Sequence, residues 1–195
     1  MIRTRQTASW LVLLPALFGL GAASCKKPAR TPEEAFRRLE RAVAAGNGAD
    51  FYRALDAASR EEISSVYTDE RSERTIIRAK YPDAAAAAAL ANLDAASADD
   101  ALHYFEKVCA RQKIVERYRK RLGAVSGPIM TRKDGPNAMW VARKDGMPFH
   151  FVHDADGSWG FSELDGEWAL EKDRASHAVK TVRENATLYE KAGSP

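Results

Sequence analysis

Cysteine is rare in this sequence, with only Cys25 and Cys109 among 195 residues. The sequence also contains no paired-cysteine zinc motif, no glycine-rich phosphate loop, no His-Glu-x-x-His run and no nucleophile elbow. The apolar run from Trp10 to Leu20 is shorter than the roughly 20 residues of a transmembrane helix, and Pro15 interrupts it. We therefore start without a motif for a metal, nucleotide or cofactor, and we expect no cofactor.

Excess positive charge is also small once the first 24 residues are set aside. They contain two arginines and no acidic residue, so the chain after them has 28 basic and 27 acidic side chains. No basic patch with interleaved aromatic residues is visible, and nucleic-acid binding depends on such charge to neutralise phosphates. We therefore expect no nucleic-acid partner.

The N-terminus has the order of a secretory signal peptide. Two arginines, Arg3 and Arg5, precede the apolar run, and small residues follow it up to Ser24. Residues 1–24 are therefore expected to be removed on export. The compartment is then oxidising, yet with Cys25 modified Cys109 has no partner in the chain, so it is either a buried thiol or an intermolecular crosslink.

The small residues before Cys25 resemble the lipobox of bacterial lipoproteins. In that family the cysteine receives a diacylglyceryl group and becomes the first residue after cleavage, so the resemblance implies lipid attachment at Cys25 and a membrane partner. More than one acyl chain makes such anchorage stable. An ordinary signal peptide is the alternative, because Ala22 and Ser24 also satisfy the small-residue cleavage rule.

Residues 25–30 form a short tether before the first helix signal. Five extended residues after Cys25 reach at most about 18 Å, so the domain is expected to sit close to the bilayer. The three basic residues of the tether either favour anionic headgroups or are simply solvated. Lys26 is not the Asp that resembles an inner-membrane retention signal, so we expect the outer membrane, facing the periplasm.

Helix signals dominate residues 31–123. Thr31-Pro32-Glu33-Glu34 predicts a capped helix that ends near Gly46, followed by a short helix at 51–55. A third helix is expected from a cap at Ser59 to Pro82, and the alanine run 84–89 predicts a thin helix or connector. A long helix from a cap at Ser97 to Gly123 is the expected cover of the sheet, with Cys109 on its buried face as a small hydrophobe rather than a reactive thiol.

Residues 127–164 predict a four-stranded antiparallel meander. Asp-Gly pairs at 134, 145 and 156 recur every eleven residues, each closing a three-residue loop whose glycine takes positive φ. Counting from these loops pairs Ile129 with Met139, Met139 with Phe151, Val141 with Phe149, and Phe151 with Phe161. Odd-numbered apolar residues then share one face that needs a cover.

A last helix is expected at about 167–192. Its apolar residues need a surface, and the even face of the meander, with Met130, Trp140, His150 and Val152, is the expected seat. The fold class is therefore α+β, with a helical N-terminal half packed on the meander plus a C-terminal helix, all in one domain spanning 31–195.

The Thr31–Ala35 helix start, the Gly46-Asn47 break and the meander with its Asp156-Gly157-Ser158-Trp159 turn together resemble the nuclear transport factor two-like, ketosteroid isomerase-like superfamily. The resemblance covers residues 31–60 and 127–164 and implies a cone-shaped cavity against the sheet. In the family's enzymes acid-base residues converge inside that cone. His153 and Glu163 are the ionisable candidates on the odd face here, and solvated rim residues are the alternative.

A metal site is not expected at His150, His153, Asp154 and Asp156, because the two histidines point to opposite faces of a strand. Three functions stay open. The favoured one is a non-catalytic, lipid-anchored domain that binds an apolar small ligand or an envelope protein near the membrane. The others are an isomerase or hydratase that uses His153 or Glu163, and a purely structural envelope protein.

Overall fold

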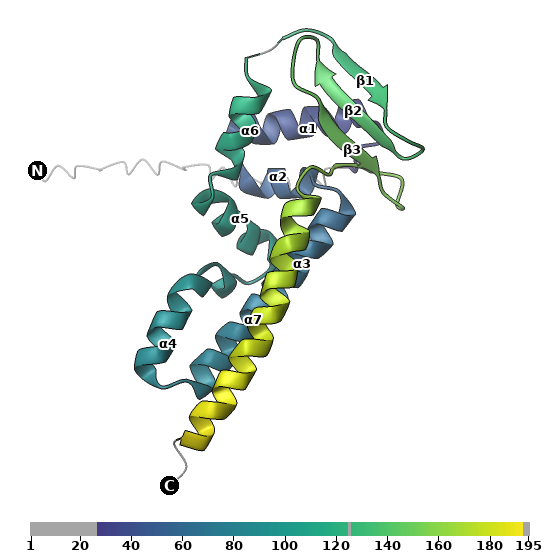
Figure 1. Cartoon of the computed structure of the whole chain (residues 1–195). Helices are drawn as coiled ribbons and strands as arrows, with labels where there is room; N and C mark the ends of the chain where they lie inside the picture. Colours follow the sequence, from purple (N-terminus) through teal and green to yellow (C-terminus); the bar gives the residue numbers. More distant parts are fainter. Residues whose placement is uncertain (1–26, 125, 193–195) are drawn as a thin grey trace, which may run out of the picture.

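The computed structural model describes residues 27–124 and 126–192, and it shows an α+β fold with a four-stranded antiparallel sheet (Figure 1). The expected signal peptide and Cys25 lie outside the described residues. No helix among the described residues is long and apolar enough to cross a membrane. The elements are, in chain order, α1 (Pro32–Ala45), α2 (Gly48–Ala54), α3 (Ala57–Lys80), α4 (Asp83–Leu90), η1 (Ala91–Leu93), η2 (Ala95–Ser97), α5 (Ala101–Arg111), α6 (Ile114–Leu122), β1 (Ile129–Lys133), β2 (Ala138–Arg143), β3 (Phe149–His153), β4 (Trp159–Phe161) and α7 (Asp165–Ala192).

The first helix begins and ends as predicted, whereas two later caps differ. The Thr31 hydroxyl accepts a hydrogen bond from the Glu34 amide, and Gly46 ends α1 at φ 67°. The cap of α3 is Asp56 rather than Ser59, and the cap of α5 is Asp100 rather than Ser97. In both cases an aspartate carboxylate accepts the hydrogen bond of the amide three residues later.

The predicted long helix over 97–123 is two helices. Lys113 adopts a left-handed conformation at φ 54°, which ends α5 and starts α6 in a new direction. Non-glycine residues rarely take this conformation, and no glycine or proline marks the break. Cys109 on α5 is buried, as predicted for a small hydrophobe.

The sheet has the order β1-β2-β3-β4, and three of the four predicted pairs are confirmed. Phe151 lies between Met139 and Phe161. The fourth pair is wrong, because Ile129 pairs with Arg143 and Met139 pairs with Lys133. Pro136 follows the first Asp-Gly pair and has no amide to donate, so the loop extends to Asn137. The shift is even, so the odd-numbered residues keep their face.

The turns differ in which residue takes the left-handed conformation. Gly135 and Gly157 have positive φ, as predicted. In the second loop Asp145 takes φ 66° and Gly146 does not, so the predicted place of the positive φ is wrong there. Aspartate tolerates this conformation better than most residues, because its short side chain bonds locally.

The odd face of the sheet is packed mainly by α1. The Phe36 ring lies 5.9 Å from Phe149 and 6.1 Å from Phe151, and Tyr118 of α6 lies 5.2 Å from Phe161. The sequence assigned this cover to the long helix, and only its second part, α6, contributes. The cover lies on α1 because Phe36, Leu39 and Val43 form a continuous apolar stripe.

The C-terminal helix does not pack on the even face of the sheet. It lies beside α3 and runs parallel to it, since Ser59 bonds Asp165 at one end and Lys80 pairs with Glu190 at the other (Figure 1). The buried α7 residues Ala175, Val179 and Ala186 are small and suit close helix packing. The even face is left partly open, with Met130 57% exposed.

The far end of the α3–α7 pair has a small core of its own. Ile77, Leu93 and Ala96 are its buried residues, separate from the main core. Helix α4 packs there without burying any residue, as the alanine run predicted for a thin helix. The molecule therefore has a well-packed body around the sheet and a lightly packed extension.

Candidate functional site

The expected cone cavity on the odd face is filled by the protein's own side chains. Val141, Phe149, Phe151 and Phe161 are each at most 1% exposed. The aromatic face that suggested an apolar ligand is therefore core. Four surface pockets among the described residues are lined by other side chains, and neither His153 nor Glu163 borders any of them.

The two acid-base candidates are not brought together. His153 is exposed, and its ring lies 5.1 Å from Trp159. Glu163 is partly buried, accepts a hydrogen bond from the His150 amide at 3.1 Å, and pairs with Arg121 at 2.5 Å. Both carboxylate oxygens of Glu163 are therefore engaged by the protein itself, so the arrangement opposes a cone-type isomerase built on these residues.

The histidines lie on opposite faces, as predicted from strand geometry. His150 Nδ1 lies 2.7 Å from the Ser162 hydroxyl and its Nε2 lies 3.2 Å from Asp134. Among the described residues, no group of three or more metal-binding side chains comes together.

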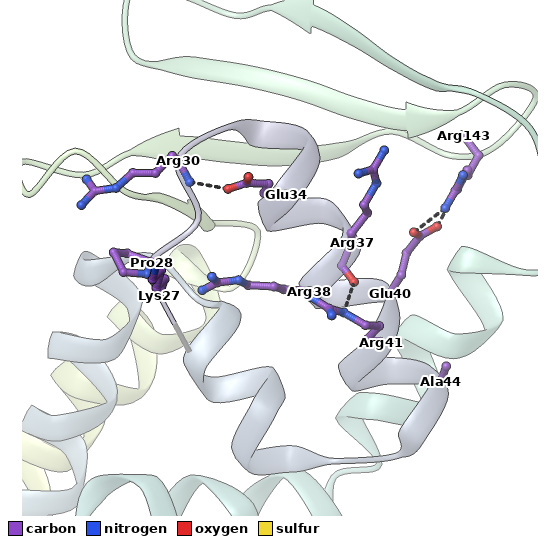
Figure 2. Close-up of a pocket in the computed structure, with 10 residues that line it drawn as sticks. All are labelled: Lys27, Pro28, Arg30, Glu34, Arg37, Arg38, Glu40, Arg41, Ala44 and Arg143. Atoms are coloured by element: carbon purple, nitrogen blue, oxygen red, sulfur yellow. Dashed lines mark hydrogen bonds and ion pairs between the residues drawn. The ribbon is translucent and has the colours of Figure 1, made fainter. Parts of the chain in front are cut away.

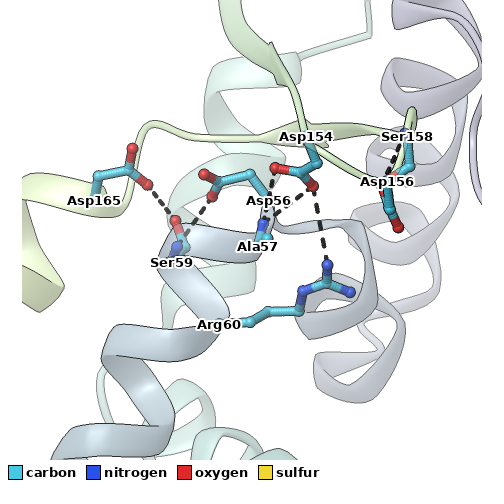
Figure 3. Close-up of polar contacts among 8 residues, drawn as sticks. All are labelled: Asp56, Ala57, Ser59, Arg60, Asp154, Asp156, Ser158 and Asp165. Atoms are coloured by element: carbon cyan, nitrogen blue, oxygen red, sulfur yellow. Dashed lines mark hydrogen bonds and ion pairs between the residues drawn. The ribbon is translucent and has the colours of Figure 1, made fainter.

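A cluster of carboxylates lies where the sheet meets α3 and α7 (Figure 3). Asp56 is 2% exposed and accepts a hydrogen bond from the Ser59 amide. Asp154, from the end of β3, accepts the Ala57 amide at 3.1 Å and lies 3.9 Å from Arg60. The Ser59 hydroxyl donates to Asp165, the first residue of α7.

Burial raises the pKa of Asp56, and the nearby negative charge of Asp165 raises it further. Burial likewise raises the pKa of Asp154. Their oxygens are occupied by the free amides that begin α3, and the positive end of a helix stabilises acidic groups. The cluster therefore fastens three elements together, and neither Asp56 nor Asp154 borders a described pocket.

The strongest candidate for a binding site is the outer face of α1 (Figure 2). Glu34, Arg37, Arg38 and Arg41 recur at helical spacing on the face opposite to the buried stripe. They border a pocket of about 940 Å³. Its lining contains six cationic side chains and two carboxylates, namely Lys27, Arg30, Arg37, Arg38, Arg41 and Arg143 with Glu34 and Glu40. We call this the α1 cationic pocket.

The tether contributes directly to this pocket, and it is docked on the sheet. The Trp159 amide donates to the Ala29 carbonyl at 2.9 Å. The Arg30 guanidinium donates to the Gly157 carbonyl at 3.3 Å, and the Arg30 amide donates to Glu34 at 2.8 Å. The tether is therefore fixed from Ala29 onward, so only residues 26–28 separate Cys25 from the folded body.

Sequence reasoning missed the α1 cationic pocket. Its residues are split between α1, the tether and Arg143 on β2, so no continuous basic run appears. The signal was available in part, because three arginines occupy one face of a helix whose other face is apolar.

Comparisons with known proteins add no relative. The chain matches no protein-family model, no curated protein and no solved structure. The resemblances to bacterial lipoproteins and to the nuclear transport factor two-like superfamily therefore stay predictions.

Proposed function

We propose that this protein is a lipid-anchored domain of the bacterial cell envelope, attached through Cys25, that acts by binding close to the membrane rather than by catalysis. The observation that carries the proposal is the docked tether. Ala29 is 2% exposed and hydrogen-bonded to the sheet, only four residues after Cys25. Four extended residues span at most about 14 Å, so a lipid at Cys25 would bring the α1 face next to the headgroups.

The buried odd face of the sheet and the pairing of Glu163 with Arg121 favour binding over an isomerase activity. The proposed location is the outer membrane, facing the periplasm, because Lys26 follows the cysteine. An envelope protein or a small ligand is the expected partner. The face available to it is charged rather than aromatic, since the aromatic side of the sheet is buried.

The test is mass spectrometry of the N-terminal peptide from membrane-fractionated protein. Loss of residues 1–24 and a diacylglyceryl mass on Cys25 are expected, together with release of a Cys25→Ser variant from the membrane fraction. The matched control is Cys109→Ser, which replaces a buried thiol and should leave the protein in the membrane fraction. An unmodified Cys25 in a soluble wild-type protein would contradict the proposal.

A further inference from the structure

We propose that the α1 cationic pocket binds the phosphate of anionic lipid headgroups in the membrane that carries the anchor. This rests on the proposed function, which places the pocket at the membrane. Three features of the pocket support this assignment, namely its free cationic groups, its nearness to the tether and its size.

The carboxylates of the pocket are already engaged. Glu40 binds Arg143 through both oxygens, at 2.8 and 2.7 Å, and Glu34 accepts the Arg30 amide. Within residues 27–124 and 126–192, neither Arg37 nor Arg38 forms an ion pair. In Figure 2 both guanidinium groups extend from α1, and neither forms a hydrogen bond or ion pair with the other residues drawn. Two planar donor forks are therefore open to an anion, and such forks match phosphate oxygens.

The charge is concentrated on this face. The chain after residue 24 is almost neutral, with 28 basic and 27 acidic side chains, yet the pocket has six cationic groups against two carboxylates. The rest of that chain therefore has an acidic excess. A basic face on an otherwise acidic molecule orients it toward an anionic surface, over distances set by salt screening.

The position of the tether favours a lipid headgroup over a soluble phosphate compound as the ligand of the pocket. Lys27 and Pro28 line the pocket, and Lys27 follows Cys25 by two residues, or about 7 Å of extended chain. Headgroups beside the anchor would thus be within reach at high local concentration. The pocket volume of about 940 Å³ falls in the ~300–1,000 Å³ range of small-ligand sites.

The experiment uses residues 25–195 with Cys25→Ser, so that neither an acyl chain nor the expected signal peptide contributes. Co-sedimentation is measured with vesicles of pure phosphatidylcholine and with vesicles containing about one third phosphatidylglycerol, as an anionic surface for a polybasic site. We expect at least tenfold tighter binding to the anionic vesicles, weakening steeply as salt rises from about 0.05 to about 0.5 M. Arg37→Glu with Arg38→Glu should lose most of this difference.

The matched control is Arg78→Glu with Arg183→Glu, which makes the same charge change at two exposed residues of the α3–α7 extension. It should bind as the Cys25→Ser parent does, and circular dichroism should show all proteins folded. Equal binding to both vesicles, or equal loss in both charge-reversal variants, would overturn the proposal.

Glycerol phosphate, titrated by calorimetry, separates a soluble ligand from a lipid. Binding of glycerol phosphate that depends on Arg37 and Arg38, without vesicle binding, would overturn the lipid assignment and indicate a soluble phosphate ester. The outcome does not depend on acylation, because Cys25 is absent from every protein used. An unmodified Cys25 in the wild type would therefore contradict the proposed function and leave this result standing.

Discussion

Glu73 lies on the buried face of α3 and is 6% exposed. Burial raises its pKa to about 7, and the negative charges of Glu70 and Asp69 add to the shift. No cation balances it among the described hydrogen bonds and ion pairs. The residue therefore favours the folded state only while it is protonated.

The first prediction concerns Glu73→Gln. A raised folded-state pKa contributes stability that is full below about pH 4.5 and is lost as the pH rises through about 7. Glutamine stays neutral, so the variant should be more stable than the wild type by about 1–3 kcal/mol at pH 8, at 1.36 kcal/mol per pKa unit and allowing for partial solvation. At pH 4 the difference should be small.

Urea unfolding at pH 4, 6 and 8 measures this difference. Glu61→Gln, at an exposed position on the same helix, is the matched control and should change stability by less than about 0.5 kcal/mol throughout. A Glu73→Gln gain that does not grow between pH 4 and pH 8 would show that the carboxyl is not buried in its charged form.

Some residue positions were predictable from the sequence and others were not. Phe151 between Met139 and Phe161 was predictable, because alternation and Asp-Gly turns fix a register. Lys113 was not, since its left-handed conformation depends on how α5 and α6 pack. Arg37 and Arg38 were recognisable as lying on one polar helix face, but that they line one pocket with Lys27 and Arg143 is a property of the folded chain.

At the level of elements, β4 is clamped between two other segments. The Asp56 amide donates to the Phe161 carbonyl on one side, and Ala29 accepts from Trp159. Gly160 lies between these contacts, and a Cβ built there would lie 2.3 Å from the Asp56 Cα. Only glycine allows this approach between two backbones.

Gly160→Ala should therefore destabilise the fold by about 3 kcal/mol or more, because both partners are backbone and cannot rotate away. Thermal and urea denaturation measure the loss. The control is Gly166→Ala in the first turn of α7, where nothing beyond the local helix backbone lies within 4 Å of the added Cβ. It should gain about 0.5–1 kcal/mol from helix propensity. Equal effects of the two alanines would contradict the close approach.

The α3–α7 pair explains why the position of α7 was mispredicted. On α3 the residues Ile63, Val66, Glu70, Glu73 and Ile77 follow a coiled-coil-like spacing, but two glutamates interrupt its apolar pattern. The even face of the sheet was the predicted packing surface for α7 because Trp140 and Val152 are apolar. Small residues on α7, such as Ala175, allow α7 to pack closely on α3. A hydropathy pattern does not predict this preference.

Val179→Asp should separate this pair. Val179 is 5% exposed on α7, and a buried unpaired carboxylate costs about 3 kcal/mol or more. Leu188→Asp is the matched control, since Leu188 is 61% exposed on the same helix and the change should cost less than about 0.5 kcal/mol. Equal unfolding midpoints for the two variants would mean that α7 does not depend on α3.

At the scale of the whole molecule, packing is uneven from one end to the other. The body around the sheet contains the fully buried aromatic residues, including Phe36, Phe51 and Phe161. The hydrophobic core cluster of the extension has three buried residues, Ile77, Leu93 and Ala96, and α4 buries none. Regions with few buried apolar contacts open at lower free energy than the global transition.

We therefore expect hydrogen exchange to divide the molecule. Amides of α4 and the last turns of α7 should exchange through local opening, orders of magnitude faster than those of α1, α2 and β3. Ile77→Ala should accelerate exchange in the extension alone, while Phe51→Ala should accelerate it everywhere, because Phe51 contacts Phe105, Tyr118 and Phe161 together.

Mass spectrometry of peptides from 83–90 and from 149–161 makes the comparison. Uniform protection of the two peptides, or a global effect of Ile77→Ala, would show one cooperative unit instead. With the expected division, the α1 face and its tether belong to the rigid end, so the proposed membrane contact is made by the most stable part of the molecule.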